Sequence, residues 1–205
     1  MVVKQIKSKF LRGEFDQNTY VCVKGKDAVI IDAGAELADI KKAVKGKRVL
    51  AVLMTHLHFD HLYNIESYIK EFDCNIYISQ GAESALTSAR ENASVIIFEN
   101  LTFNVPANNI KYYSEEIELG EFNFKVIKTP GHTKDSVCLL TEDMLFTGDT
   151  VFADTIGRTD LVGGDISDMQ DSLKKLLAVE YDVAYPGHFG KAKKSVIDKV
   201  INYYI

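Results

Sequence analysis

The sequence predicts a mixed α/β fold made of two similar halves, with β-sheets inside and helices outside. Short apolar runs of strand length alternate with segments in which apolar residues recur at helical spacing. This succession of strands and helices occurs twice along the chain, which favours two sheets covered by helices. The length of 205 residues suits a sizeable core, so we expect one domain over residues 1–205.

The first half contains a run that is typical of a doubly covered strand. Residues 48–55 are apolar almost without interruption, as in a sheet that is buried on both faces. Lys24-Gly25-Lys26-Asp27 separates two β-branched runs and predicts a hairpin turn. The expected elements are strands at 20–23, 28–32, 48–55 and 75–79, a helix marked by Leu37, Ile40 and Val44 that ends at Gly46, and a helix marked by Ile65, Tyr68, Ile69 and Phe72.

The second half repeats this order after an irregular stretch. Residues 89–116 are rich in Asn and predict a long surface excursion, a feature that is more often functional than idle. Ser167-x-x-Gln170 predicts a capping box at the start of a helix. The expected elements are strands at 122–129, 136–140, 144–147 and 183–185, a helix marked by Ile166, Met169, Leu173, Leu176 and Leu177, and a final helix at 192–204.

Composition excludes several classes of protein. The 24 Lys and Arg against 29 Asp and Glu give a net charge of −5, which argues against a nucleic-acid binder that works by bulk positive charge. No run approaches the ~18 apolar residues of a membrane-spanning helix, and residues 1–10 hold no stretch of signal-peptide length. The three cysteines are odd in number and widely spaced, so they predict no disulfide framework. We therefore expect a cytoplasmic protein that contacts neither membranes nor nucleic acid.

Four residues with metal-binding side chains follow the predicted strand 48–55 within six positions: His56, His58, Asp60 and His61. Sites in sheet-based folds usually open at the carboxyl ends of strands. Residues two apart in an extended segment point to the same side, so His56 and His58 can reach one ion. Asp60 and His61 lie past the strand and can turn toward a second ion. A lone histidine is more often solvated or buried in a core, but four such residues at this spacing indicate a metal site.

The remaining two histidines, His132 and His188, occupy similar positions. Each follows a predicted strand and a Pro-Gly pair, which is turn chemistry that presents a side chain at a sheet edge. Asp149, in Gly148-Asp149, follows the strand 144–147 in the same way. All five histidines of the chain thus follow strands, whereas chance placement would put some of them on helices.

These motifs resemble those of the metallo-β-lactamase superfamily and, within it, the glyoxalase II (hydroxyacylglutathione hydrolase)-like proteins. The resemblance covers nearly the whole chain and implies a four-layer αββα sandwich with the site at one edge, between the two sheets. It is carried by Ala28-Val29-Ile30-Ile31-Asp32-Ala33-Gly34, His-x-His-x-Asp-His at 56–61, Pro-Gly-His-Thr at 130–133, Gly-Asp at 148–149 and Pro-Gly-His at 186–188. The segment Gly157-Arg158-Thr159-Asp160-Leu161 with Gly163-Gly164-Asp165 resembles the single-domain branch.

The resemblance also implies roles for individual residues. His56, His58 and His132 would hold a first metal ion; Asp60, His61 and His188 would hold a second; and Asp149 would bridge the two. Such nitrogen and oxygen ligands suit Zn²⁺, with Fe or Mn as alternatives. Two ions roughly 3.5–4 Å apart can share a hydroxide that attacks the carbonyl of a small-molecule thioester, such as an S-2-hydroxyacylglutathione. Asp60 is the expected catalytic residue, because its carboxylate can orient that hydroxide or accept a proton.

Three residues near these motifs are candidates for substrate contacts. Tyr63 could stack or hydrogen-bond, or belong to the core; Lys134 could meet an anionic tail. Arg158 could contact substrate, or it could hold the loop below the metals together with Asp160.

Two rival functions stay open. One is an oxidoreductase of the persulfide dioxygenase type, with one iron held by His56, His132 and Asp149 or a neighbouring histidine. The other is a catalytically inactive module that binds metal and interacts with a partner.

Overall fold

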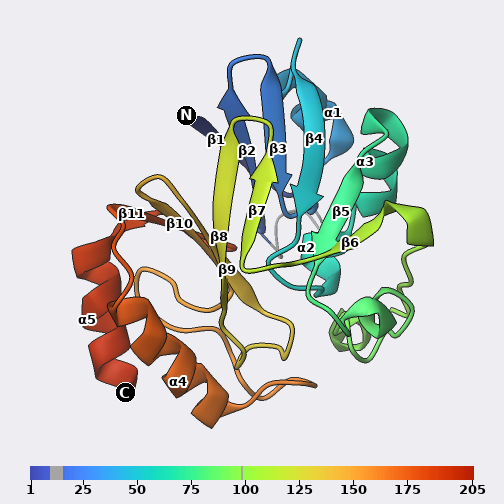
Figure 1. Cartoon of the computed structure of the whole chain (residues 1–205). Helices are drawn as coiled ribbons and strands as arrows, with labels where there is room; N and C mark the ends of the chain where they lie inside the picture. Colours follow the sequence, from blue (N-terminus) through green and yellow to red (C-terminus); the bar gives the residue numbers. More distant parts are fainter. Residues whose placement is uncertain (10–15, 98) are drawn as a thin grey trace.

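The computed structural model describes residues 1–9, 16–97 and 99–205. Within these residues two six-stranded sheets pack face to face, with helices on both outer sides (Figure 1). Phe10 of the N-terminal segment and Phe98 of the 89–116 segment lie outside the described residues. No helix in the described part of the chain is long and apolar enough to cross a membrane.

The first sheet is mixed and has the strand order β1-β2-β3-β4-β5-β6. Its strands are β1 (Val2–Lys7), β2 (Asn18–Lys24), β3 (Asp27–Ile31), β4 (Arg48–Leu53), β5 (Asn75–Ile78) and β6 (Ile110–Tyr112). β1, β2 and β3 pair antiparallel, whereas β3, β4, β5 and β6 pair parallel. Because parallel strands end at a common edge, the loops after β3 and β4 lie side by side.

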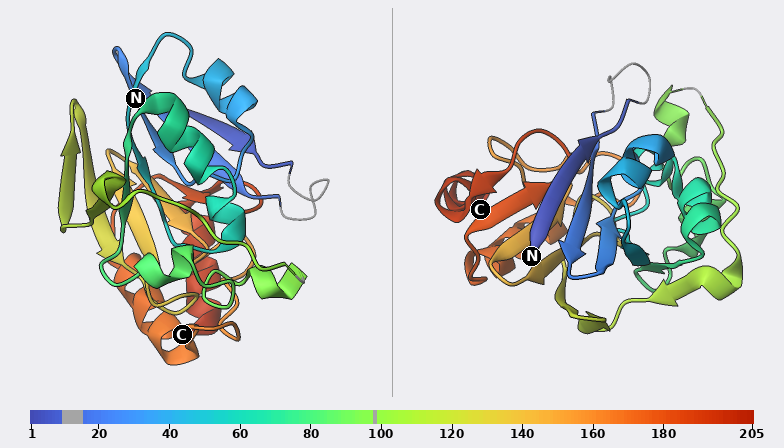
Figure 2. Two further views of the ribbon diagram at one scale, coloured as in Figure 1. Left: turned by 90° about the vertical axis from the view of Figure 1, so that its right-hand side faces the viewer. Right: turned by 90° about the horizontal axis from the view of Figure 1, so that it is seen from above.

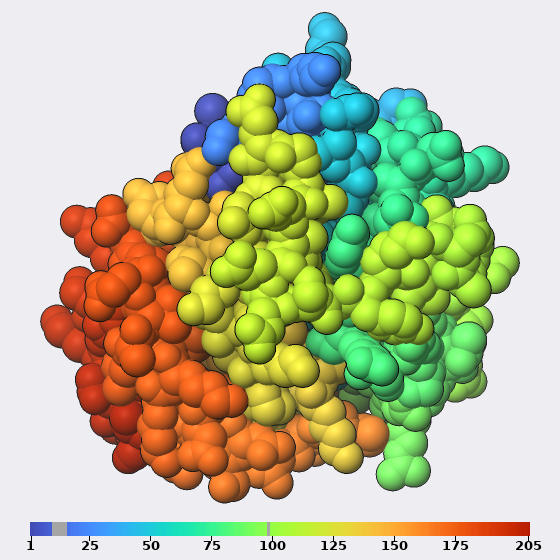
Figure 3. All heavy atoms as spheres, viewed as in Figure 1, coloured from blue at the N-terminus to red at the C-terminus, as the bar shows by residue number. Residues whose placement is uncertain are grey.

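The second sheet has the order β12-β11-β10-β9-β8-β7. Its strands are β7 (Glu116–Leu119), β8 (Phe122–Lys128), β9 (Val137–Thr141), β10 (Met144–Gly148), β11 (Val183–Pro186) and β12 (Ala192–Lys193). Neighbouring strands pair antiparallel except for β10 and β11, which are parallel. The hairpin of β7 and β8 runs down the middle of the face seen in Figure 3 and stands between the two halves.

Helices cover the outer face of each sheet. They are α1 (Leu37–Ala43), the short α2 (Phe59–Leu62), α3 (Ile65–Phe72), α4 (Ile166–Leu177) and α5 (Lys194–Tyr204). Ile40 of α1 and Ile65 of α3 join a buried apolar cluster on the first sheet. Leu173 of α4 and Ile197 of α5 join another on the second sheet. The view from above in Figure 2 shows the two helical layers on opposite sides of the strands, so the predicted αββα arrangement is confirmed.

A third apolar cluster fills the space between the sheets. Val29 and Leu53 of the first sheet face Phe124 and Phe146 of the second, and all four side chains are buried. Tyr20 packs its ring edge on Phe146 with the ring centroids 5.3 Å apart. Alternate residues of β3 from Ala28 to Ile31 belong to this cluster and to the outer one, which explains why these four positions are all apolar.

Most predicted elements are present, with four corrections. The strands β1, β6 and β7 and the short helix α2 were not predicted; β6 falls within the expected irregular stretch 89–116. The capping box at Ser167 is wrong, because Asp165 caps α4 by accepting hydrogen bonds from the backbone N–H groups of Ser167 and Asp168. Helix α1 ends at Ala43, three residues before Gly46, and the final segment begins with β12 before it becomes helical at Lys194.

We expect Phe146→Ala to lower the free energy of unfolding by about 3–5 kcal/mol, because it leaves a cavity between the sheets. Urea denaturation followed by circular dichroism measures this change. Tyr203→Ala is the matched control, because Tyr203 is 84% exposed, and surface substitutions usually change stability by less than about 0.5 kcal/mol. Equal effects of the two substitutions would contradict the assignment of Phe146 to the core.

Candidate metal centre

The ends of four strands bring five histidines and two aspartates together at one edge of the sandwich. We call them the central cluster: His56, His58, Asp60, His61, His132, Asp149 and His188. His56 and His58 follow β4 in extended backbone, and Asp60 and His61 lie on α2. His132 follows β8, Asp149 follows β10 and His188 follows β11. The structure thus brings together all seven residues that the sequence singled out as metal ligands.

Within the central cluster, two groups of three residues have the spacing of metal ligands. His56, His58 and His132 offer ligand atoms within 4.8 Å of one another, and so do Asp60, His61 and His188. In the first group, His58 Nδ1 lies 2.9 Å from His132 Nε2. In the second, His188 Nε2 lies 3.2 Å from Asp60 Oδ2.

Asp149 lies between these two groups. Its Oδ2 is 3.6 Å from His132 Nε2 and 3.3 Å from His188 Nε2, and its Oδ1 is 3.4 Å from His61 Nε2. His56, His61 and Asp149 form a further group with the spacing of metal ligands. This position suits a carboxylate that serves both halves of the cluster.

The donor atoms fit a cation. Four buried atoms of the central cluster have no hydrogen-bond partner among the described residues: His56 Nε2, His58 Nε2, His61 Nε2 and Asp149 Oδ1. Buried polar atoms are normally paired, and a metal ion would supply the missing partner of His56 Nε2, His61 Nε2 and Asp149 Oδ1. The His58 ring presents its other nitrogen, Nδ1, to His132. Gly187 borders the same space, because a Cβ there would lie 2.2 Å from Asp149 Oδ1 and 2.7 Å from His61 Cε1.

Outer contacts orient the imidazole rings. His61 Nδ1 lies 2.9 Å from Asp32 Oδ2, His56 Nδ1 lies 3.2 Å from Thr55 Oγ1, and His132 Nδ1 lies 2.7 Å from the carbonyl oxygen of Arg158. Such contacts engage Nδ1 of each ring, so that Nε2 is the nitrogen available to the cluster, and they fix the direction of the ring.

Asp32 is a functional residue that the sequence analysis missed. It follows β3 and accepts hydrogen bonds from Thr55 N at 2.8 Å and Thr55 Oγ1 at 2.9 Å, besides its contact with His61. The sequence shows only an acidic residue after an apolar strand; its place at the site depends on the parallel pairing of β3 with β4, which opens both strand ends at the same edge. Its buried carboxylate links β3, β4 and α2.

The two halves of the central cluster differ in charge. Burial lowers the pKa of His58 to about 3, and burial followed by the neighbouring His61 holds the pKa of His56 well below its ordinary value. Both rings are therefore neutral and able to bind a cation. Burial opposes charge on His188 too, but Asp149 and Asp60 outweigh it and raise its pKa to about 10. His61 also has a strongly raised pKa, because Asp32, Asp149 and Asp60 outweigh its burial.

The predicted excursion at 89–116 supports α2. The backbone N–H of Phe59, the first residue of α2, donates to the carbonyl of Asn92 at 2.8 Å. Asn92 is buried, and its side-chain amide donates to the carbonyls of Ala85 and Leu101. One asparagine thus closes the loop and holds it against the helix that carries Asp60.

The three predicted substrate contacts lie around the cluster rather than in it. Tyr63 is the C-cap of α2 and is 42% exposed. Lys134 is exposed and lines a cavity of about 350 Å³ together with Glu91 and Val162. The Arg158 guanidinium pairs with Asp160 through two 2.7 Å hydrogen bonds, and these contacts agree with a loop-holding role. Contact of these residues with substrate stays a prediction.

We expect Asp32→Asn to weaken metal binding by roughly 10–100-fold, because the loss of an outer partner disorients a ligand ring. Competition with a chromogenic chelator measures the dissociation constant. Asp171→Asn, at an exposed acid far from the cluster in sequence, serves as the control. Unchanged affinity in the Asp32 variant would contradict the orienting role.

The metal-free protein is expected to lose stability as pH rises from about 6.5 to about 10. Because the pKa of His188 is raised to about 10, the folded state keeps a proton that the unfolded state releases above pH 6.5. Protonated His188 therefore stabilises the folded state fully below pH 6.5, and this stabilisation is lost as the pH rises to about 10. Thermal melts across this range, with and without a chelator, test the prediction. Bound metal takes the place of the proton, so the metal-loaded protein should show a smaller loss. Equal slopes in both forms would contradict the assignment.

Known proteins share both the sequence pattern and the fold. A family model described as the metallo-beta-lactamase superfamily matches residues 12–188. The probable metallo-hydrolase YqgX of Bacillus subtilis (strain 168) is 31% identical over 182 residues, covering 86% of each chain. The crystal structure of BLEG-1 B3 metallo-beta-lactamase superposes with a TM-score of 0.87 at 30% identity, covering 97% of this chain and 96% of that one. The structure of TTHA1623 in a di-iron-bound form has a TM-score of 0.81 at 25% identity, covering 96% of this chain and 98% of that one. The chain belongs to the metallo-β-lactamase superfamily.

Proposed function

We propose that this protein is a hydrolase that cleaves small-molecule thioesters with two divalent metal ions held by the central cluster. One observation carries the proposal: Asp149 contacts both groups of three ligand residues, and buried ligand atoms of the cluster have no hydrogen-bond partner among the described residues. The name probable metallo-hydrolase, given to the similar YqgX, supports a metal-dependent hydrolase.

The seven residues divide between two ions in this proposal. His56, His58 and His132 would hold the first ion; Asp60, His61 and His188 would hold the second, with Asp149 shared. The di-iron form of the similar TTHA1623 supports a two-ion site. Imidazole and carboxylate ligands without thiolate favour Zn²⁺, with Fe or Mn as alternatives.

Bound divalent ions would supply Lewis acidity that polarises a carbonyl and makes water more acidic. Asp60 would handle the proton. Although burial opposes it, His61 and His188 lower the pKa of Asp60, so its carboxylate is ionised and can accept a proton. No histidine in the chain lies outside the central cluster to act as a separate base.

The cysteines are unsuited to nucleophilic attack. Cys22, Cys74 and Cys138 are buried, and burial raises the pKa of Cys74 and of Cys138 to about 11. A thiol attacks as thiolate, so these groups are unreactive near neutral pH. Ser136 shares its hydroxyl with Thr133 Oγ1 at 2.7 Å. Water is therefore the nucleophile in this proposal.

The thioester is proposed as substrate on two grounds. The loop at 157–165, which resembles that of glyoxalase II-like proteins, reaches the centre through the contact of His132 with the carbonyl of Arg158. Lys134 stands at a cavity next to the His132 turn, and no carboxylate of the described residues pairs with its ammonium group, so it is available to an anionic tail. The net charge of −5 favours a small molecule over nucleic acid as partner.

A second candidate is the hydrolysis of β-lactam amides, which the likeness to BLEG-1 B3 metallo-beta-lactamase favours.

The test of the proposed function is a panel of S-lactoylglutathione, simple acyl thioesters and a chromogenic cephalosporin, run beside elemental analysis of the bound metal. Thioester turnover with two ions per chain supports the proposal. One iron per chain with oxygen uptake on glutathione persulfide would overturn it in favour of a dioxygenase. Full metal loading without turnover of any substrate would favour the inactive binding module.

We expect His58→Ala to lower both bound metal and thioester turnover, the latter by at least ~100-fold, because a ligand contributes more than an outer-shell partner. Elemental analysis and the thioester assay on the same preparation check this, with Asp171→Asn as control. Unchanged metal content and turnover would contradict the assignment of His58.

A further inference from the structure

Phe189, directly after His188, adopts a backbone conformation that bulky residues rarely take. Its φ is +62°, in the left-handed region where Cβ crowds the following carbonyl. Four other described non-glycine residues share a positive φ: Asp32, Asp73, Ala93 and Glu142. Among them, Phe189 is the one large aromatic residue.

The surrounding structure holds this conformation in place. The carbonyl oxygen of Phe189 accepts hydrogen bonds from Asn18 Nδ2 at 3.0 Å and from Gln5 Nε2 at 3.4 Å. Asn18 Nδ2 also donates to the carbonyl of Pro186 at 3.0 Å, so the whole turn around His188 is fixed by the first sheet.

Burial does not compensate for the strain at Phe189. The residue remains 57% exposed, and its ring meets Phe152 edge-on with the centroids 5.4 Å apart. Glycine would adopt the same backbone conformation without strain. An exposed aromatic ring in a strained position points to a role other than packing.

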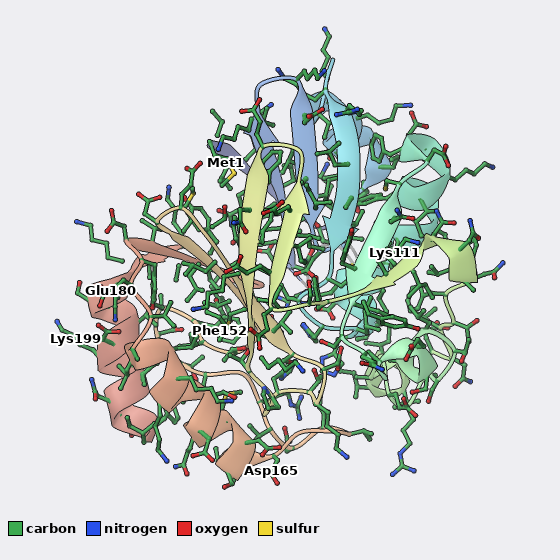
Figure 4. All side chains as sticks on the ribbon, in the orientation of Figure 1. Met1, Lys111, Phe152, Asp165, Glu180 and Lys199 are labelled. Carbon is green, nitrogen blue, oxygen red and sulfur yellow. The ribbon has the colours of Figure 1, made fainter. Side chains whose placement is uncertain are left out.

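The ring lies where the central cluster opens to solvent. The side chain of His188 is 18% exposed, while those of Asp60, His61, His132 and Asp149 are at most 10% exposed. The ring centroids of Phe152 and Phe189 both lie 6.2 Å from that of His188. Phe152, labelled in Figure 4, is buried and backs the exposed ring from within. The two rings form an apolar wall beside the opening.

We propose that Phe189, backed by Phe152, is a binding subsite for an apolar aliphatic or aromatic group that the substrate carries close to its reacting carbonyl. This inference rests on the proposed thioesterase function and names the class of thioester: one with an apolar group on the acyl or the thiol side. The strain at Phe189 is then explained, because a side chain at this position lies beside His188 and remains exposed to solvent.

The first test compares Phe189→Gly with Phe189→Leu, which keeps an apolar side chain. Acetyl and hexanoyl thioesters of N-acetylcysteamine vary the acyl side, and ethyl and benzyl thioacetates vary the thiol side. In one of the two pairs, we expect Phe189→Gly to raise KM about tenfold for the thioester that has the larger apolar group. This factor corresponds to the loss of roughly half the free energy gained by burying an apolar side chain. KM for acetyl-N-acetylcysteamine should rise less than KM for the larger member, and Phe189→Leu should restore most of the affinity. Asp171→Asn, at an exposed acid, is the control that should leave metal content, kcat and every KM within twofold. The pair that responds identifies the side that carries the group.

Stability separates this role from a structural one. Because Phe189→Gly relieves backbone strain, we expect its Tm to stay within about 3 °C of that of the wild type. A fall in Tm of more than about 5 °C, or an equal rise in KM for small and large members of both pairs, would overturn the proposal. Conversion of a dimer to a monomer by Phe189→Gly in size-exclusion chromatography would also overturn it, since the ring would then bind a second copy of the chain.

A binding measurement does not depend on turnover. The chain has no Trp, so Phe189→Trp introduces a single reporter at the opening. The S-hexyl and S-benzyl thioethers of N-acetylcysteamine, which cannot be hydrolysed, are expected to shift its emission to shorter wavelength, and the S-methyl analogue is the control. A shift without thioester hydrolysis by the wild type would leave the subsite standing and refute the proposed reaction. Hydrolysis with no shift for either large thioether would refute the subsite alone.

Discussion

Negative charge buried at the edge between the sheets is the constraint on which the site depends. Asp32, Asp60 and Asp149 are at most 9% exposed, and all three lie close to His61. Buried carboxylates require compensation, because their desolvation outweighs any gain from packing. Without a metal, His61 and His188 supply that compensation by holding protons, as their raised pKa values indicate. A cation in the cluster would take over this role, so metal binding and proton release are coupled.

The topology explains how residues from four strand ends reach one point. β3 and β4 are parallel, and β10 and β11 are parallel, so each pair ends at a common edge of its sheet. Packing of the sheets around Tyr20, Leu53 and Phe146 brings these edges together. Tyr20 adds a direct link, because its hydroxyl donates to the carbonyl of Pro186 at 2.7 Å, just before His188. The apolar core between the sheets therefore sets the distances within the cluster.

The sequence predicted the fold class and the seven clustered residues because both have strong local signals. β4 is apolar on both faces, and four of the five histidines follow strands directly or in short turns, while His61 lies on the short helix α2. What it missed lacked such signals. β1 is an edge strand with mostly exposed residues, so its pattern does not differ from that of a loop. Asp165, Ser167 and Asp168 are all suitable N-cap residues for α4, and only the backbone geometry shows that Asp165 is the one that caps the helix.

Outer partners of the ligands were harder to predict for a further reason. The contact of His132 is a backbone carbonyl, that of Arg158, and a carbonyl leaves no signature in residue type. The contact of His61 with Asp32 spans 29 positions, so it becomes visible only when β3 and β4 lie side by side. Prediction from sequence thus succeeded where chemistry is concentrated in short motifs and failed where it depends on tertiary pairing.

Ligand positions and rim positions are under opposite physical demands in this structure. A ligand must be buried and oriented, so the turns that carry His132, Asp149 and His188 are fixed by hydrogen bonds and by close backbone contacts such as that of Gly187 with Asp149. A group that selects substrate must stay exposed at the opening. Phe189 meets both demands at once: its backbone is fixed through Asn18 as part of the His188 turn, while its ring remains in solvent. The strain in its backbone follows from this combination, because the turn that orients His188 also imposes the left-handed conformation on the residue that follows.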